Sequence, residues 1–261
     1  MSNHTFAICA YKESPFLGEC IESVLSQDNA ESEVYISTST PNEYISRLAG
    51  KYGLDVYVNT GKRGIGPDWN YAYSRASNDY VTIAHQDDVY LPGYAKAAVE
   101  SLSSRDDSLI FFSNYGEIRN GQPVDENRNL KIKRQLLKGL DGKNVDDIRV
   151  RRRALSFGDP ICCPAVTFNK VNCPNPPFLT DMKCDLDWGT WERLSLLKGG
   201  FFYNSDILMR HRIHEESTTS SLIVDNTRYN EDLEMLKRFW PTPIAKLINY
   251  FYKQSENSNA L

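Results

Sequence analysis

The 261-residue sequence lacks the features of several broad protein classes. No apolar run reaches the roughly 18–20 residues that a membrane-spanning helix needs. No apolar stretch follows the first methionine, so we expect no secretory signal and a cytoplasmic protein, at most peripheral at the inner face of a membrane. The 30 basic residues do not outnumber the 34 acidic ones, and the net charge of −4 argues against a nucleic-acid partner.

The sequence also lacks the cysteine spacing of a structural zinc site. None of its six cysteines stands in a Cys-x-x-Cys pair. A chain of this length without a secretory signal more often keeps buried thiols than disulfides, so we expect six free thiols. Apolar content of 41% and charged content of 25% are typical of one large globular domain, or of a domain with an appendage.

Strand and helix patterns alternate through the first 113 residues. Strands are expected at residues 5–11, 34–36, 54–58, 80–84 and 108–112, and helices lie between them. This alternation predicts an α/β fold with a parallel sheet and helices on both faces. Capping residues predict three helix starts, at Ser14 with Pro15, at Thr40 with Pro41, and at Asp68.

The alternation ends after residue 113. Asn120 and Gly121 predict a tight turn between antiparallel strands. Residues 131–153 carry nine Lys or Arg and no clear strand pattern, and residues 157–177 are rich in Pro and Cys, which predicts an irregular, buried connection. Residues 187–197 predict a helix that packs through its tryptophans.

The most informative segment joins a short strand to two adjacent carboxylates. The strand at residues 81–84 is followed by His85, Gln86, Asp87 and Asp88. In an α/β sheet, ligands bind beyond the carboxyl ends of the strands. Carboxylates at that position suit a hard cation such as Mg²⁺ or Mn²⁺, which in turn binds phosphates. An isolated Asp-Asp pair is more often a turn, so the surrounding motifs decide between the two interpretations.

Those motifs resemble, in order, the motifs of family 2 glycosyltransferases with the GT-A fold. They are Phe6–Glu13 with Leu17–Gln27, Gly61–Asn70 with Asn78–Tyr80, His85–Asp88 with Leu91 and Pro92, Asp187–Arg193, and Arg212–His214 with Ser217. The resemblance implies a GT-A-type mixed, mostly parallel sheet flanked by helices. It also implies a nucleotide-sugar-binding half at residues 1–113, an acceptor half at 114–215 and a C-terminal helical appendage with a disordered tail at 216–261.

The resemblance further implies a set of site residues. Asp88 would bind Mn²⁺ or Mg²⁺, and His214 would complete the metal shell or approach the diphosphate. Asp187 would deprotonate the acceptor hydroxyl, and a single base opposite the leaving group predicts inversion at the anomeric carbon. The nucleotide diphosphate sugar would lie against Ala10, Tyr11, Glu13, Thr38, Arg63, Asn70 and Asp87.

Several of these residues have a second interpretation. Asp187 is suited to cap the helix that follows it, and Asp185 is the nearest competing base. A lone histidine such as His214 is more often an ordinary hydrogen-bonded surface residue, and His211 is a weaker candidate still. Lys62 and Arg63 are equally well explained as a solvated basic turn.

Three positions depart from the family pattern. Residues 37–40 are Ser-Thr-Ser-Thr, where the family commonly has an acid that pairs with the nucleobase, although a UDP-sugar stays the expected donor. His85 stands where the metal motif often begins with Asp. Leu186 stands where a Glu often precedes the base.

Two segments bear on the acceptor, a saccharide or a lipid-linked saccharide. The basic run Arg149–Arg153 would attract a phosphorylated lipid or an anionic membrane, or it is simply solvated. Residues 244–252 have apolar side chains at helical spacing beside Lys246 and Lys253. That helix would lie in a membrane interface, pack on its own domain or form a dimer contact. We expect disorder from Ser255 onward.

The predicted function is therefore metal-assisted glycosyl transfer in the synthesis of a bacterial surface polysaccharide or glycolipid. Two alternatives remain. A nucleotidyltransferase would carry a glycine-rich and basic loop after its first strand, whereas this sequence has Tyr11–Pro15 there. A non-catalytic nucleotide-sugar-binding module would keep the fold without turnover.

Overall fold

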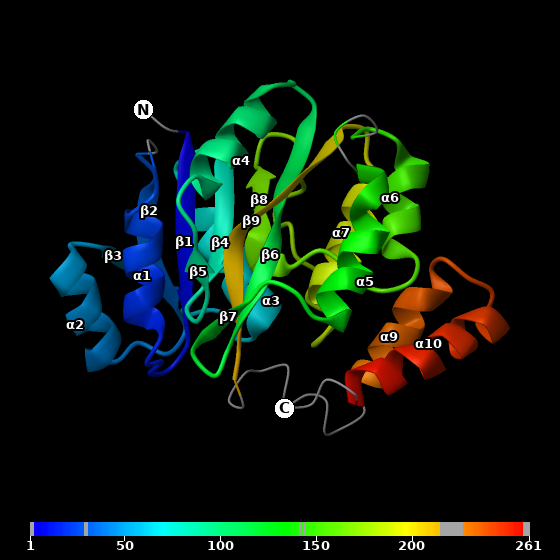
Figure 1. The fold of residues 1–261 in the computed structure, drawn as a ribbon. Coiled ribbons are helices and arrows are strands. Elements are labelled where there is room, and N and C mark those ends of the chain that lie inside the picture. Colours follow the sequence, from blue (N-terminus) through cyan, green and yellow to red (C-terminus); the bar gives the residue numbers. More distant parts are fainter. Residues whose placement is uncertain (1–2, 29–30, 141, 143–144, 215–226, 258–261) are drawn as a thin grey trace.

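The computed structural model describes residues 3–28, 31–140, 142, 145–214 and 227–257, the last six by their backbone alone (Figure 1). Within this part of the chain, nine strands form one mixed sheet in the order β3-β2-β1-β4-β8-β6-β9-β5, and β7 pairs with β6. Helices flank the sheet, as Figure 1 shows. The expected α/β fold is confirmed.

Residues 4–103, apart from the short strand at residues 89–90, are here called the parallel region and contain four parallel strands and four helices. The strands are β1 (His4–Ala10), β2 (Glu33–Thr38), β3 (Asp55–Val58) and β4 (Tyr80–His85). The helices are α1 (Leu17–Leu25), α2 (Glu43–Tyr52), α3 (Ile65–Arg75) and α4 (Tyr94–Ser103). Each expected strand of this region lies within two residues of its predicted bounds, because its alternating or fully buried apolar residues leave one register available.

Two of the predicted helix starts are wrong, because each helix begins later in the chain than its expected capping residue indicates. α1 begins at Leu17, three residues beyond Ser14. α2 is capped by Asn42, whose side chain accepts the N–H of Ile45. The Thr40 hydroxyl instead accepts the N–H of Lys12, at 2.6 Å, and so joins the loops that follow β1 and β2.

The third predicted helix start is also displaced. α3 begins at Ile65, so Asp68 lies in its first turn and not before it. The Asp68 carboxylate accepts hydrogen bonds from the Ser39 hydroxyl at 2.8 Å and from the Asn59 amide at 2.6 Å. A residue that resembles a helix cap therefore ties together the loops after β2 and β3.

The second half of the sheet differs from the expected continuation of parallel strands. Its strands are β5 (Val89–Tyr90), β6 (Ser108–Arg119), β7 (Gln122–Val124), β8 (Val166–Asn169) and β9 (Gly200–Ile213). β8 lies antiparallel between β4 and β6, so the connection expected at residues 157–177 contains a central strand. β6 continues through residue 113 as one strand and forms a hairpin with β7, which confirms the turn at Asn120 and Gly121.

The helical region comprises α5 (Arg128–Leu137), α6 (Ile148–Leu155), α7 (Leu186–Ser195) and α9 (Thr227–Lys237). α6 carries the whole basic run Arg149–Arg153, and only part of that run is solvated. Arg151 is fully buried and donates to the carbonyls of Leu197 and Gly199, at 2.9 and 2.8 Å. Arg152 pairs with Glu192. An anionic ligand would therefore meet fewer free charges here than the sequence indicates.

The helix α10 (Thr242–Asn257) packs on α9 with one face and presents the other to solvent. Ala245 and Asn249 are buried, whereas four large side chains are exposed, Ile244, Leu247, Tyr250 and Phe251. The backbone stays helical past Ser255 to Asn257, and residues 258–261 lie outside the described residues. Among the helices described, none combines the length and apolar character needed to cross a bilayer. All six cysteines are free, as expected.

Candidate active site

The carboxyl ends of β1, β2 and β4 meet at one edge of the sheet. Their register pairs Ala10 with Thr38 and Cys9 with His85. The Gln86 side chain accepts the N–H of Tyr11 at 3.0 Å and donates to its carbonyl at 3.1 Å, which joins the loop after β1 to the acidic motif. Parallel strands align their ends in this way, so the residues expected around the nucleotide diphosphate sugar lie on neighbouring loops.

Asp88 is the most buried carboxylate of this edge, with no exposed surface. Its Oδ1 accepts hydrogen bonds from Nδ1 of His211 and from the N–H of Arg212, both at 2.9 Å. Its Oδ2 has no hydrogen-bond partner among the described residues and lies 3.9 Å from Nδ1 of His85. A buried carboxylate oxygen without a donor is costly, and this oxygen keeps its lone pairs unused by the described residues.

Asp87 is held by residues at and just beyond the end of β9. Its Oδ2 lies 2.9 Å from Nε2 of His214, and its carbonyl accepts from Nε of Arg212 at 2.8 Å. Arg212 also pairs with Glu19 of α1 at 2.5 Å. Although burial raises the pKa of Asp87, the hydrogen bond with His214 and the charges of His211 and His85 lower it below its ordinary value. Asp87 is therefore an anion at neutral pH.

His211 was the weaker of two candidates in the sequence, yet it contacts the more buried aspartate. Burial lowers its pKa, but the charge of Asp88 and the hydrogen bond to it raise the pKa to about 9. The scarcity of histidine in the sequence is the feature that could have identified His211 as a site residue. Three of only four histidines, residues 85, 211 and 214, surround the two aspartates.

His85 connects the acidic motif to the rest of the site. Its ring stacks on Trp69, with centroids 4.7 Å apart. Burial lowers its pKa, while the charges of Asp88, Asp87 and Asp187 act in the opposite direction. The imidazole thus lies between the acidic motif and Trp69 of α3.

Asp187 lies in the first turn of α7, and the cap position of that helix belongs to Asp185. The alternative that Asp187 is the helix cap is wrong. Its carboxylate accepts the N–H of Trp188 at 2.8 Å. Burial raises the pKa of Asp187, and this N–H and the charge of Lys133 oppose the shift. A carboxylate with a raised pKa accepts a proton more readily than one in water, which suits a general base.

Asp185, the competing base, is less accessible than Asp187. It is 6% exposed, and burial with the neighbouring charges of Asp232 and Asp187 raises its pKa well above the ordinary value. A carboxyl group buried beside a second carboxylate tends to keep its proton. Asp185 is therefore poorly suited to accept one from a substrate.

The two residues expected on the loop and helix before β4 behave differently. Arg63 is exposed. The Asn70 amide is already used: it donates to the carbonyl of Phe178 and accepts its N–H, both at 2.9 Å. Asn70 thus fixes the loop that leads to α7.

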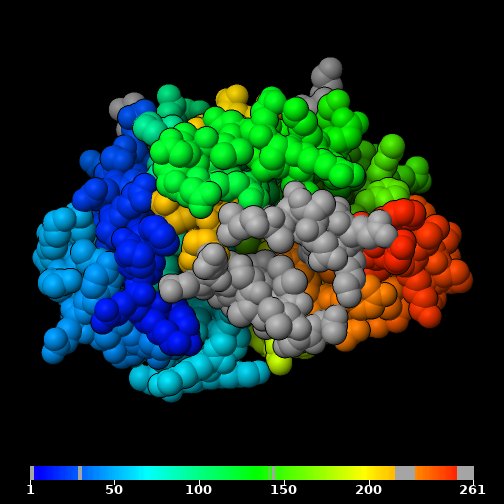
Figure 2. Space-filling view, turned by 60° about the horizontal axis from the view of Figure 1, so that its bottom comes forward, coloured from blue at the N-terminus to red at the C-terminus, as the bar shows by residue number. Residues whose placement is uncertain are grey.

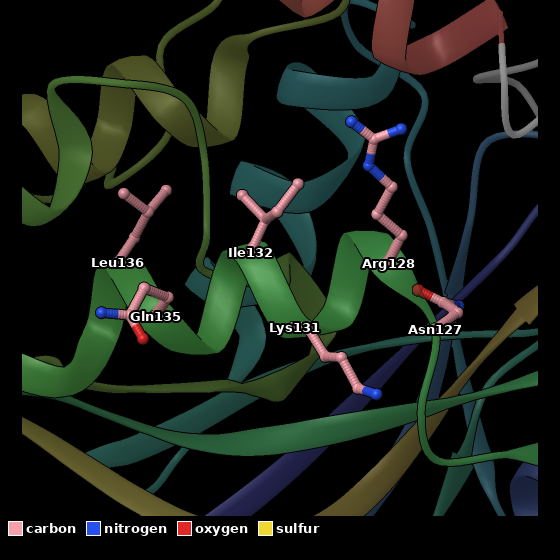
Figure 3. Close-up of a pocket in the computed structure, with 6 residues that line it drawn as sticks. All are labelled: Asn127, Arg128, Lys131, Ile132, Gln135 and Leu136. Atoms are coloured by element: carbon pink, nitrogen blue, oxygen red, sulfur yellow. The ribbon is translucent and has the colours of Figure 1, made fainter.

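A surface hollow runs along α5 in the helical region (Figure 3). Its lining combines cationic, amide and aliphatic side chains, namely Asn127, Arg128, Lys131, Ile132, Gln135 and Leu136. Figure 2 shows the parallel region and the α9–α10 pair at opposite sides of one face of the molecule.

The acidic motif does not form a preassembled metal centre. Among the described residues, no group of three or more His, Cys, Asp or Glu side chains is arranged to hold a metal ion. Asp87 and Asp88 are each paired with a histidine instead. The composition of the cluster, two carboxylates with imidazoles, still fits a divalent cation, and Oδ2 of Asp88 is the atom left for it.

Comparison of the chain with known protein families gives one match. The model of glycosyl transferase family 2 matches residues 5–159. An uncharacterized glycosyltransferase of Rickettsia typhi is 21% identical over 243 residues, which are 92% of this chain and 71% of that protein. A relative from Rickettsia conorii is 24% identical over 235 residues, and there the chain spans only 36% of the relative.

Solved structures share the fold at low sequence identity. The mannosyltransferase PcManGT from Pyrobaculum calidifontis, in complex with GDP-Man and Mn²⁺, has a TM-score of 0.62 at 14% identity and covers 94% of this chain and 68% of its own. S. aureus TarS 1–349 in complex with UDP-GlcNAc has a TM-score of 0.60 at 15% identity and covers 98% and 73%. The GT-A fold expected from the sequence is confirmed.

Proposed function

We propose, since the chain belongs to glycosyltransferase family 2, that it moves a sugar from a nucleotide diphosphate to an acceptor hydroxyl with inversion. The carrying observation is that the chain presents two acidic centres, Asp87 with Asp88 paired to His214 and His211, and Asp187 in the first turn of α7. Glycosyl transfer needs both centres, one at the departing diphosphate and one at the attacking hydroxyl.

The donor is proposed to lie at the edge formed by β1, β2 and β4. Ala10, Tyr11, Glu13 and Thr38 would contact the nucleoside, and Arg63 would approach the phosphates. The complexes of two structural neighbours, with UDP-GlcNAc and with GDP-Man, support a nucleotide sugar as the donor. A UDP-sugar is our first choice.

A divalent cation is proposed to assist. Oδ2 of Asp88 would bind it, with Asp87 and His214 completing the shell once the present pairs rearrange. When bound, Mn²⁺ or Mg²⁺ would supply positive charge against the departing diphosphate. Arg212 would hold the backbone of Asp87 in place, since its guanidinium bridges that carbonyl and Glu19.

Asp187 is proposed as the base. Its raised pKa and its half-buried position in the first turn of α7 suit it to take the proton of an acceptor hydroxyl. With one base opposite the leaving group, the acceptor oxygen loses its proton to Asp187 and bonds to the anomeric carbon as the bond to the diphosphate breaks, in a single step. That step inverts the anomeric carbon.

The acceptor is proposed to be a saccharide or lipid-linked saccharide in surface polysaccharide or glycolipid synthesis. The exposed apolar face of α10 would contact the inner face of the membrane peripherally. Co-sedimentation with anionic vesicles should therefore be weakened by Leu247→Glu and unchanged by Asn257→Glu at the far end of the helix. Equal binding of both variants would contradict the membrane contact.

The test of the donor and metal sites is a thermal-shift panel of UDP, GDP, CDP and dTDP with and without Mn²⁺. A ligand that binds only the folded state adds about 2.7 kcal/mol at a hundredfold excess over Kd. We expect a Mn²⁺-dependent shift for one nucleotide that Asp88→Ala loses and that Asp55→Ala, an exposed control on β3, keeps.

The same panel separates the alternatives. No shift with any nucleotide would contradict a nucleotide-sugar site. A shift with no turnover of the parent protein, measured as nucleotide release across several saccharide acceptors, would favour the non-catalytic module.

A further inference from the structure

The carboxylate of Glu231 on α9 binds the backbone immediately before α7. Its two oxygens accept the N–H of Lys183 at 2.9 and 3.1 Å, and Oε2 also accepts those of Cys184 at 2.7 Å and Asp185 at 3.1 Å. One side chain thus holds three consecutive amides that lie 46 to 48 residues away in the sequence. Hydrogen bonds to an ionised carboxylate are the stronger kind, so this contact fixes the turn.

α7 needs this help because it has no side-chain cap of its own. Asp185 occupies the cap position, but its side chain accepts no N–H of the helix among the described residues. That side chain is buried instead beside Asp232, which also lies on α9. The amides that lead into α7 obtain their acceptor from Glu231, so the entry to the helix is fixed from outside it.

α9 is itself firmly attached to the body of the protein. Met235 and Leu236 are buried in the main core. Arg238, one residue beyond α9, pairs with Glu192 of α7 at 3.3 Å. A side chain at the position of Gly189 would collide with Leu179 and come within 3.7 Å of Met235, so α7 and α9 approach each other closely there. Glu231 therefore acts from a rigid support.

The held turn ends two residues before Asp187. The position of a side chain in the first turn of a helix follows from the backbone that starts the helix. Among the described residues, the Asp187 carboxylate accepts the N–H of the next residue, a contact that lies within its own helical turn. Movement of the Lys183–Asp185 turn would therefore move the carboxylate directly.

We propose that Glu231 is a positioning residue for glycosyl transfer, holding the turn of Lys183–Asp185 so that Asp187 faces the acceptor hydroxyl. The proposal rests on the role of Asp187 given above. It assigns a function to α9, a helix that follows the β9 segment and lies outside the family match at residues 5–159. Glu231 touches no reacting atom and acts through the backbone.

The test compares Glu231→Ala and Glu231→Gln with Glu234→Gln. Glu234 is exposed on the same helix and pairs only with Lys237 in the described structure, which makes it a matched control. We expect Glu231→Ala to lower kcat at least tenfold with the donor KM changed less than threefold. Glu231→Gln, which keeps one accepting oxygen, should recover part of the loss. The control should match the parent.

Two further measurements separate positioning from general damage. Amide hydrogen exchange at residues 183–185 should accelerate at least tenfold in Glu231→Ala and not in the control. In an Asp187→Asn background, Glu231→Ala should lower kcat no further, because the base that it positions is already gone.

Three results would overturn the proposal. An unchanged kcat in Glu231→Ala, despite faster amide exchange at residues 183–185, would show that this turn does not determine the position of Asp187. A parallel fall of kcat, donor affinity and melting temperature would show a role in the fold alone. A parent protein without turnover would remove the proposed function, and the positioning role with it, whatever the exchange rates.

Discussion

The parallel region and the helical region place their functional groups by different means. In the parallel region, strand pairing aligns the ends of β1, β2 and β4, so the loops that follow them meet without further help. In the helical region, single charged side chains reach distant backbone groups: Arg151 binds two carbonyls after α7, and Glu231 binds the amides before it. In the parallel region the sheet topology sets the positions of the functional groups, whereas in the helical region these positions depend on hydrogen bonds made by individual side chains.

The largest effect is expected at Asp187, where the helical region supplies the chemistry. Asp187→Asn keeps the size and polarity of the side chain and removes the proton acceptor, so kcat should fall by about 10²–10⁴-fold. Nucleotide binding, which depends on the parallel region, should stay within threefold by thermal shift. Asp181→Asn, an exposed site in the preceding loop, is the control. A parallel loss of nucleotide binding would contradict the separation of the two regions.

Arg151 tests whether one side chain holds the end of α7. Arg151→Met leaves two buried carbonyls without their donor, and we expect a loss of about 3 kcal/mol in the free energy of unfolding. Arg149→Met changes an exposed arginine on the same helix and should cost less than about 0.5 kcal/mol. Urea denaturation measures both. Equal losses would mean that the basic run acts as a surface charge.

Asn70 of α3 joins the parallel region to the loop before α7 through Phe178. Its substitution tests whether that contact contributes to stability, to nucleotide binding or to both. Asn70→Ala removes two hydrogen bonds to Phe178 and should cost about 2 kcal/mol of stability. Ser74→Ala, on the exposed side of α3, should change little. Nucleotide affinity of the same variant, measured by titration, decides whether Asn70 also contacts the donor as the family resemblance implies. A large loss of affinity with full stability would assign it to the donor alone.

A pH dependence is expected in the parallel region, and it has no effect at neutral pH. His4 is fully buried between the hydroxyls of Ser32 and Thr82, and burial lowers its pKa to about 3, from the 6.5 of an unfolded chain. Below pH 6.5 the His4 imidazole of the unfolded chain binds a proton, whereas in the folded protein the same imidazole stays neutral down to about pH 3. Stability is therefore complete above pH 6.5 and falls by about 1.4 kcal/mol per pH unit between 6.5 and 3.

His4→Gln, which can keep both hydrogen bonds, should remove this slope. Unfolding free energies at pH 7, 6, 5 and 4 for parent and variant measure it. The same slope in both proteins would mean that other groups cause the acid dependence.

The same difference between the regions explains what the sequence could predict. The strands of the parallel region have apolar patterns between clear loops, and their order along the chain implies their alignment. β8 has only four residues inside a Pro- and Cys-rich segment, and nothing local to Val166–Asn169 indicates that it separates β4 from β6.

Side-chain roles were less predictable for a similar reason. Thr40 and Asp68 have the local signature of helix caps, yet both bond to neighbouring loops. Asp87 and Asp88 were recognisable from their place after a strand. Glu231 was not, because its acceptor role depends on a backbone turn 46 residues earlier. The local sequence pattern predicts a helix or a strand. It does not predict which distant backbone or side-chain group will form a hydrogen bond with a residue of that helix or strand.

Arg212 has a consequence for the order in which the protein acquires its shape during synthesis. Its N–H binds Asp88, 124 residues upstream, and its guanidinium binds Glu19, 193 residues upstream. A ribosome that has delivered the first two hundred residues to the exit tunnel has made every strand of the parallel region. At that stage the Asp88 carboxylate, just beyond the end of β4, still lacks the hydrogen bond from Arg212 that offsets the cost of burying its charge. Contacts of such long sequence separation form late, so the nascent chain completes its acidic motif among its last steps.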